Sequence, residues 1–237
     1  MPEVAPGIRR VGSELVNSWL VEVGSDLVMV DAGLPRYWRE LFAELDSMGR
    51  SVDHVRALVL THGHGDHVGY AERARRAGIE VRVHALDESL AKGQVKNEAK
   101  IAGPKRLRPI LGFLAFAALR GYARVPNLKV VSTFEDGDIL DVPGAPRVIH
   151  APGHTRGNCA LHFAGLDALF VGDSLNTYAV TSGRRGPQLS PFNFDRAQAL
   201  ASLDRLTQVE ARHVLPGHGA AWSDGIAAAV ELARAAG

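Results

Sequence analysis

The sequence predicts an α/β (α+β) protein in which strands and helices alternate along the chain. Short apolar stretches that favour strands alternate with segments of helical periodicity over most of the 237 residues. Turn residues follow most of these stretches, and histidine or aspartate stands at several of the predicted strand ends. A chain of this length can bury a substantial core, so we expect one domain over residues 1–237.

Nine strands are expected from short apolar runs that turn residues bound. The first two should form a hairpin, because Gly24, Ser25 and Asp26 between them are a turn signal. The third runs directly into a cluster of histidines. The expected strands, in chain order, cover residues 15–23, 27–30, 55–60, 79–84, 129–132, 147–150, 160–163, 168–171 and 214–215.

Four helices are expected from apolar side chains at helical spacing and from capping residues. Leu41 and Leu45 share one face of the first helix. Gly78 is a suitable C-cap for the second, and Asp195 is a suitable N-cap for the third. The expected helices cover residues 37–48, 68–77, 195–206 and 225–235.

Residues 86–128 should form an inserted cap of two helices. Residues 92–129 contain nine basic side chains and one acidic side chain, so they carry a net charge of +8 in a chain whose net charge is +1. Three lysines recur every fourth residue and would share one helical face, and two prolines should end that helix. These residues are Lys92, Lys96, Lys100, Pro104 and Pro109.

Two interpretations of this cap are open. In the first, a solvated basic face is followed by an ordinary buried helix. In the second, Phe113, Phe116 and Tyr122 form an apolar wall that binds an acyl or other hydrophobic group. The lysines around this wall would attract anionic substrates or an acidic lipid surface.

The composition excludes several classes of protein. The 27 basic and 26 acidic side chains balance, so we expect no nucleic-acid partner. Cys159 is the only cysteine, and it is expected to pack as a small apolar residue. The first ten residues lack an apolar signal region, and the longest apolar run, 110–119, is too short to span a bilayer. We expect a soluble cytoplasmic protein with at most weak contact with a membrane surface.

The most informative feature of the sequence is a group of three histidines and one aspartate within six residues. These residues are His62, His64, Asp66 and His67, and glycines at positions 63 and 65 separate them. Imidazole and carboxylate are ligands that zinc and iron favour. The spacing directs alternate side chains towards two neighbouring points. A metal site therefore explains this stretch better than a flexible polar loop does.

Four further candidate residues follow predicted strands. Asp31 follows the strand at 27–30, and His154 lies just beyond the strand at 147–150. Asp173 and His218 follow the last two predicted strands in the same way. Loops at strand ends collect functional groups because the sheet fixes their roots. We therefore expect these side chains to gather with the first group.

This pattern resembles the metallo-β-lactamase superfamily, whose first motif is HxHxDH. The resemblance extends from about residue 17 to about residue 219 and fills all seven ligand positions. It implies a four-layer αββα sandwich, the metallo-β-lactamase fold, with the metals at one edge of two packed sheets. The implied ligands are His62, His64 and His154 for the first metal, Asp66, His67 and His218 for the second, and Asp173 as a bridge.

The resemblance also implies the chemistry. The cofactors would be two divalent metal ions, with zinc expected and iron or manganese as alternatives. They would activate water as a metal-bridging hydroxide. Asp66 would be the catalytic residue that receives the proton, and Asp31 would orient a metal-bound histidine. We predict a binuclear metal-dependent hydrolase that cleaves an ester, lactone or thioester of a small acyl or anionic molecule.

Differences from known branches of the family exclude some classes of substrate. True β-lactamases generally lack the bridging aspartate, so Asp173 argues against antibiotic hydrolysis. Glyoxalase II proteins bind glutathione through a C-terminal helical extension, but only 18 residues follow Gly219 here. A small-molecule ester, lactone or other thioester remains.

Two alternatives stay open. Persulfide dioxygenases look similar around Gly153, His154 and Thr155, and they use one iron held by two histidines and an aspartate. In that case His67 and His218 would have no role. The second alternative is a non-catalytic metal-binding protein that uses the same ligands.

Other polar residues have less specific roles. Tyr178 would reach a substrate from the loop after Asp173, or would be structural. Five histidines lack metal-ligand spacing and are expected to pack or to lie at the surface. They are His54, His84, His150, His162 and His213.

Overall fold

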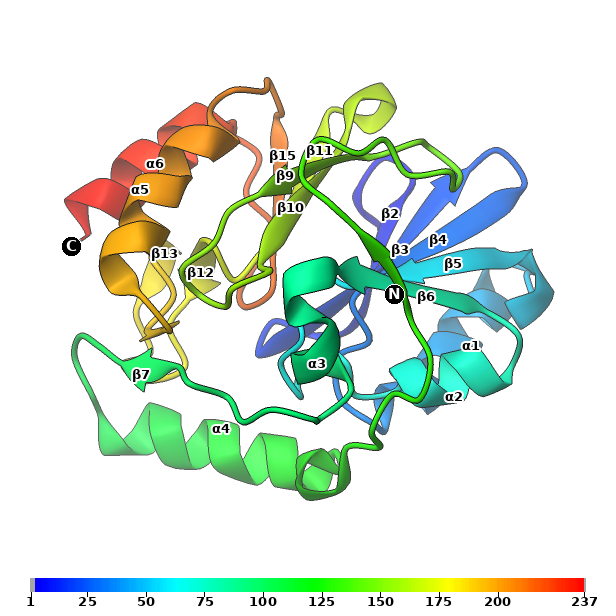
Figure 1. Cartoon of the computed structure of the whole chain (residues 1–237), viewed down its shortest axis with the longest axis horizontal. Coiled ribbons are helices and arrows are strands. Elements are labelled where there is room, and N and C mark those ends of the chain that lie inside the picture. The colour runs from blue at the N-terminus through cyan, green and yellow to red at the C-terminus, as the bar shows by residue number, and fades with distance from the viewer. Residues whose placement is uncertain (1–2, 237) are drawn as a thin grey trace.

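The computed structural model describes residues 3–236, which form two β-sheets packed face to face between two layers of helices (Figure 1). Across the larger sheet the strands are β1 (Glu3–Ala5), β2 (Ile8–Ser13), β3 (Val16–Val23), β4 (Asp26–Val30), β5 (Val55–Val59), β6 (Glu80–His84) and β8 (Ser132–Phe134). Across the smaller sheet they are β15 (His213–Pro216), β11 (Ala168–Gly172), β10 (Cys159–Phe163) and β9 (Arg147–His150).

The remaining elements are helices and two pairs of short strands. The α-helices within residues 3–236 are α1 (Tyr37–Ser47), α2 (Ala71–Arg76), α3 (Glu88–Ala91), α4 (Leu107–Leu119), α5 (Arg196–Leu206) and α6 (Ile226–Ala235). The short strands are β12 (Asn176–Tyr178) paired with β13 (Arg185–Gln188), and β7 (Lys100–Ile101) paired with β14 (Phe192–Asn193). Helices α1 and α2 lie on the larger sheet, and α5 and α6 lie on the smaller one (Figure 1).

Alternating side chains of the same strands enter different apolar cores, and these cores define four layers. Leu20 of β3 belongs to the core shared with α1, whereas the adjacent Trp19 points between the sheets. There its ring lies 6.2 Å from the Phe170 ring of β11. The neighbouring Leu169 points the other way, into a third core with Leu203 of α5. The fold is the predicted four-layer αββα sandwich.

The central strands follow the predicted pattern. Strands β3 and β4 form the expected antiparallel hairpin, and β4, β5 and β6 run parallel to one another. Strands β1 and β2, which were not predicted, extend the larger sheet beyond β3. Because β4, β5, β11 and β15 all enter loops with candidate ligands, the sheets set the position of the site.

The predicted helix at 68–77 is shorter in the structure. It corresponds to α2, which covers only six residues. The backbone N–H of Gly69 donates instead to the Gly33 carbonyl at 3.0 Å. A Cβ atom on Gly69 would lie 2.1 Å from that oxygen, so only glycine permits this close approach. Tertiary contacts therefore replace the first helical turn.

The predicted strand at 129–132 is shifted towards the C-terminus. It corresponds to β8, which begins at Ser132 and pairs with β6. The backbone N–H of Lys129 donates to the buried carboxylate of Glu72 at 3.1 Å. This bond holds the incoming chain against α2 before it reaches the sheet.

The cap at residues 86–128 contains two α-helices, α3 and α4, but the predicted helix that carries Lys92, Lys96 and Lys100 was wrong. Helix α3 ends at Ala91, and Lys100 belongs to β7, so the three lysines do not share a helical face. Only α4 is a long helix, and Pro109 lies in its first turn rather than ending a helix. Proline fits there because the first N–H groups of a helix have no acceptor within it.

Candidate metal centre

The seven predicted ligands lie in loops that leave the C-terminal ends of strands. The loop after β5 carries four of them, and it turns tightly because the His67 N–H donates to the His64 carbonyl at 2.9 Å. Gly63 is required in this loop, since a Cβ atom there would lie 2.8 Å from the Ala91 nitrogen. The loops after β9, β11 and β15 supply the other three ligands.

Three histidines form one compact group of potential ligands. His62, His64 and His154 are buried, and their ligand atoms lie within 4.8 Å of one another. His154 Nε2 is 2.8 Å from His64 Nδ1 and 3.2 Å from His62 Nε2. Nitrogen ligands on a tetrahedral zinc ion would stand roughly 3.3 Å apart, given its metal–nitrogen distances. The group therefore has the dimensions of one metal site.

A second group lies beside the first. Asp66, His67 and His218 also place their ligand atoms within 4.8 Å of one another. His218 Nε2 is 3.6 Å from Asp66 Oδ2 and 3.4 Å from Asp173 Oδ2. Asp173 Oδ2 is also 3.5 Å from His154 Nε2 of the first group. The Asp173 carboxylate thus lies between the two groups.

Backbone carbonyls fix the tautomers of two of these histidines. His154 Nδ1 donates to the Phe192 carbonyl, and His218 Nδ1 donates to the Leu15 carbonyl. A carbonyl oxygen only accepts, so each ring must carry its proton on Nδ1. In both neutral rings the lone pair is therefore on Nε2, the atom that faces the cluster.

Asp31 fixes two further rings, one directly and one through Thr61. His67 Nδ1 donates to Asp31 Oδ2 at 2.9 Å. Thr61 donates its hydroxyl to the same carboxylate at 2.9 Å, which leaves its oxygen free to accept from His62 Nδ1 at 3.0 Å. Both rings then direct Nε2 into the cluster, and His67 Nε2 is buried there without a hydrogen-bond partner. A cation would satisfy that nitrogen.

The electrostatics also favour a bound cation. Burial, followed by the neighbouring His154, lowers the pKa of His64 to about 3. Burial also acts to lower the pKa of His67, but Asp31 outweighs it and raises that pKa to about 9. Burial opposes ionisation of Asp173, yet His218 and His154 hold its pKa well below the usual range. The carboxylates thus attract positive charge that a divalent cation would supply, and the donor set fits one.

Asp87, which was not predicted as a site residue, links two of the loops that carry the ligands. This aspartate is buried three residues after β6. Its carboxylate accepts from the Gly63 N–H at 2.8 Å, from the Thr155 hydroxyl at 2.6 Å and from the Gly157 N–H at 2.7 Å. It therefore links the loop of the first histidines to the loop of His154. Its position beyond a strand end, like that of Asp31, was the available signal.

The predicted substrate contacts divide into two groups. Phe113 of α4 and Tyr122 line a cavity over the metal ligands, and the Phe113 ring lies 6.1 Å from the His218 ring. Phe116 lies outside that lining and packs under the Arg120 guanidinium at 3.9 Å. Tyr178 also lies outside it, on β12, with the Arg185 guanidinium 5.4 Å from its ring.

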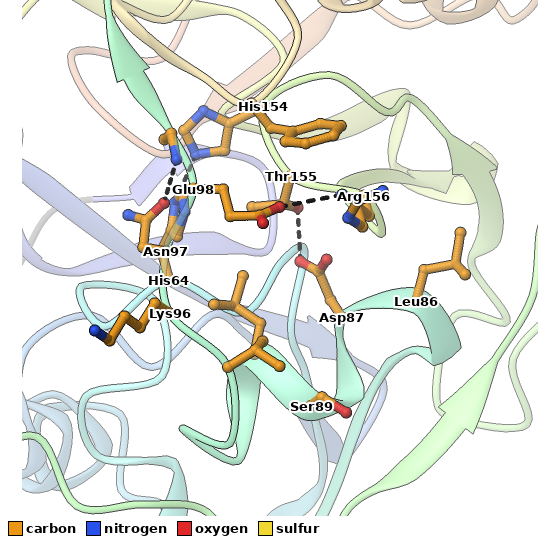
Figure 2. Close-up of a pocket in the computed structure, with 14 residues that line it drawn as sticks. His64, Leu86, Asp87, Ser89, Lys96, Asn97, Glu98, His154, Thr155 and Arg156 are labelled. Carbon is orange, nitrogen blue, oxygen red and sulfur yellow. Dashed lines mark hydrogen bonds and ion pairs between the residues drawn. The ribbon is translucent and has the colours of Figure 1, made fainter.

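A larger cavity adjoins the metal ligands on the side of His64 and His154 (Figure 2). It encloses ≈ 650 Å³ of empty space, including its open mouth. Leu90 contributes to its apolar wall. Glu98 of the cap forms an ion pair with Arg156 of the His154 loop at 3.1 Å, as Figure 2 shows. The cap and a metal loop thus meet across this cavity.

The other histidines and the cysteine lie outside the metal groups. His84 is buried and stacks on His150 with ring centroids 4.3 Å apart. Cys159 is buried, and its thiol donates to the Thr61 carbonyl at 3.3 Å. These contacts are structural.

Comparisons with known proteins agree with this geometry. The family model described as metallo-beta-lactamase superfamily matches residues 11–218. The chain is 29% identical over 211 residues to the uncharacterized protein Rv2581c of Mycobacterium tuberculosis, a match that covers 83% of this chain and 81% of that protein. It is 28% identical over 216 residues to the acyl-coenzyme A thioesterase MBLAC2 of Bos taurus, covering 85% and 72% of the two chains.

A solved structure shows the same fold. The crystal structure of TTHA1623 in a di-iron-bound form matches with a TM-score of 0.64 and 27% identity, over 95% of this chain and 96% of that one. The chain therefore belongs to the metallo-beta-lactamase superfamily. Its class is that of a metal-dependent hydrolase.

Proposed function

We propose that this protein is a binuclear hydrolase that cleaves a small-molecule ester, lactone or thioester, and that an acyl thioester is the first substrate to test. The observation that carries the proposal is the convergence of histidine lone pairs on two adjacent groups with one carboxylate between them. Four of the five rings, those of His62, His67, His154 and His218, are held in the tautomer that a metal ligand needs. The thioesterase named above supports the substrate class, although its identity to this chain is only 28%.

The proposed metal ligands follow the two groups. His62, His64 and His154 would hold one cation, and a second would lie at Asp66, His67 and His218, with Asp173 shared. Two bound cations would supply Lewis-acid chemistry and activation of water. Zinc is our first expectation, and iron is the alternative that the di-iron relative supports.

Two side chains of the protein would act on the substrate and its proton. Asp66 is the more exposed of the two carboxylates in the cluster, since 15% of its side chain is exposed against 3% for Asp173. It lines the cavity over the ligands and would receive the proton from the attacking water. The charge of Asp66, followed by burial, raises the pKa of Tyr122 to about 12. The phenol therefore stays protonated and can donate to a substrate oxygen.

The cavity over the ligands suits a substrate with an apolar part. Phe113, Val180 and Phe192 supply apolar walls, and Asn97 and Tyr122 supply polar groups. A few polar groups in an apolar cavity orient a substrate without requiring a charged one. Once a substrate fills this space, bulk water other than the attacking molecule would be excluded.

One observation favours a second candidate function. His62, His154 and Asp173 provide two histidines and one carboxylate, and His154 Nε2 lies 3.2 Å from His62 Nε2 and 3.5 Å from Asp173 Oδ2. That donor set is typical of mononuclear iron enzymes that use oxygen. A persulfide dioxygenase-like reaction is therefore the alternative to test.

Metal analysis combined with a substrate panel distinguishes these functions. Protein purified without added metal would be analysed for metal content and assayed on acyl thioesters, esters and lactones. We expect two metals per chain, hydrolysis of at least one substrate class, and loss of activity on chelation with recovery on adding metal. One iron per chain with oxygen uptake on a persulfide would establish the alternative. Full metal loading without any turnover would reject both.

A further inference from the structure

The outer face of α4 is apolar and exposed, and no residue from 3 to 236 covers it. Leu107, Leu111 and Leu114 follow helical spacing and are 71%, 54% and 56% exposed. Leu119, at the end of the helix, is 66% exposed. Contiguous apolar patches of this kind are uncommon on a soluble surface and mark sites of interaction.

The inner face of the same helix is already occupied. Phe113 faces the metal pocket, Ala117 is buried, and Phe116 packs against the core of the larger sheet. Helix α4 is therefore anchored by one face while the opposite face stays in solvent. A helix that is apolar all round is normally covered on all sides.

Unpaired positive charges lie close to this apolar face in the sequence. Five exposed basic side chains before, within and after α4 form no ion pair with any residue from 3 to 236. No acidic residue occurs between Glu98 and Glu135. The five residues are Lys105, Arg106, Arg108, Arg124 and Lys129.

We propose that α4 docks on an anionic phospholipid surface. Its 13 residues would extend about 20 Å as a helix, too short for a bilayer core of about 30 Å. No helix within residues 3–236 is long and apolar enough to cross a membrane. An apolar face with basic flanks fits the interface instead, with leucines among the acyl chains and cations at the headgroups.

Charge argues against a second copy of this chain as the occupant. A symmetric dimer through α4 would bring the same unpaired cations of both copies together, and residues 99–134 of neither copy contain an acidic side chain to compensate. An anionic lipid surface offers the complementary charge over the whole patch. Because Phe113 on the same helix lines the metal pocket, docking would place a wall of that pocket next to the lipid.

Sedimentation with vesicles tests this inference without any assay of turnover. The full chain would be mixed with large vesicles of phosphatidylcholine, either alone or with one third phosphatidylserine, at low and high salt. We expect binding to the anionic vesicles, little binding to the neutral ones, and weaker binding at high salt.

Two variants identify the surface, and a third serves as a control. Replacing Leu111→Glu together with Leu114→Glu should reduce binding at least about tenfold. Replacing Arg108→Gln and Arg124→Gln should reduce it about fivefold for each charge removed. The matched control is Leu232→Glu on α6, where an exposed leucine lies on the other sheet, and it should bind like the unmodified protein.

Other outcomes would overturn the proposal. It fails if the unmodified chain does not sediment with anionic vesicles, or if the Leu111/Leu114 variant binds as well as the control. It also fails if light scattering shows a dimer that this variant converts to monomer, because the face would then join two copies. Unchanged metal content and melting temperature would show that each variant is folded.

Discussion

The metal loops and the cap (residues 86–128) encode their structures in different ways. In the metal loops, which carry the seven proposed ligands after β5, β9, β11 and β15, hydrogen bonds hold four histidine rings, as Asp31 holds His67. In the cap, α4 is anchored on one face only and exposes leucines on the other. A sequence motif is therefore a reliable guide where rigid strands set the loop roots. It is a poor guide where contacts between residues far apart in the sequence decide the structure, as in the cap.

The largest effect is expected from changes at the centre of the metal loops. His64→Ala and Asp173→Asn should each lower turnover at least about 10²-fold, because each removes a proposed metal ligand. Turnover and metal content would be measured together. The control is His213→Ala, whose side chain contacts Ser223 away from the cluster. An active Asp173→Asn variant that keeps both metals would contradict the bridging role.

Measurements of unfolding test whether side-chain contacts in the metal loops contribute more stability than those in the cap. Asp87→Ala leaves three buried donors without an acceptor, and we expect it to lower the free energy of unfolding by about 2 kcal/mol. Glu98→Ala removes only an exposed ion pair in the cap, and should cost about 0.5 kcal/mol or less. Urea unfolding gives both values. Equal losses would show that the two regions do not differ in this way.

The cap is expected to act on substrate rather than on metal. Phe113→Ala removes an apolar wall of the pocket and should raise KM for a long acyl substrate roughly tenfold. Phe116→Ala is the matched variant, because that ring lies outside the pocket lining. Steady-state kinetics over a series of chain lengths, with metal content as a check, measures this. An equal change of KM in both variants would show that Phe113 does not contact the substrate.

The smallest effect concerns the attachment of the cap, and it depends on pH. Hydrogen bonds from Arg75, followed by one from Arg76, lower the pKa of Glu72 from 4.5 to about 2 against the opposing effect of burial. A lowered folded-state pKa stabilises the fold above pH 4.5, and that stability is lost as pH falls towards 2. Glu72→Gln should therefore destabilise the protein by about 1 kcal/mol at pH 7, because Arg76 is exposed and screened.

Unfolding of both proteins across this range measures the effect. The difference between the unmodified chain and Glu72→Gln should shrink steadily as the solution is acidified. A difference that stays constant from pH 7 to pH 3 would mean that the charge on the Glu72 carboxylate does not stabilise the fold.

Much of the fold and of the group of metal ligands could be predicted because short stretches of sequence specify them. The β3–β4 hairpin has a turn signal between two apolar runs, and His62, His64 and His67 follow a buried strand. The position of Lys100 could not be predicted, since it pairs with β14 far along the chain. Asp87 was missed because its three donors come from loops that only folding brings together.

Asp31 adopts a left-handed backbone conformation, with φ of 61°, while its carboxylate holds Thr61 and His67. A side chain in that conformation costs about 1 kcal/mol or more, and glycine would remove the strain. Glycine would also leave the buried Thr61 N–H, the Thr61 hydroxyl and His67 Nδ1 without an acceptor, which costs more than the strain it relieves. Selection for heat resistance and selection for turnover should therefore both retain aspartate at position 31, in spite of its strained backbone.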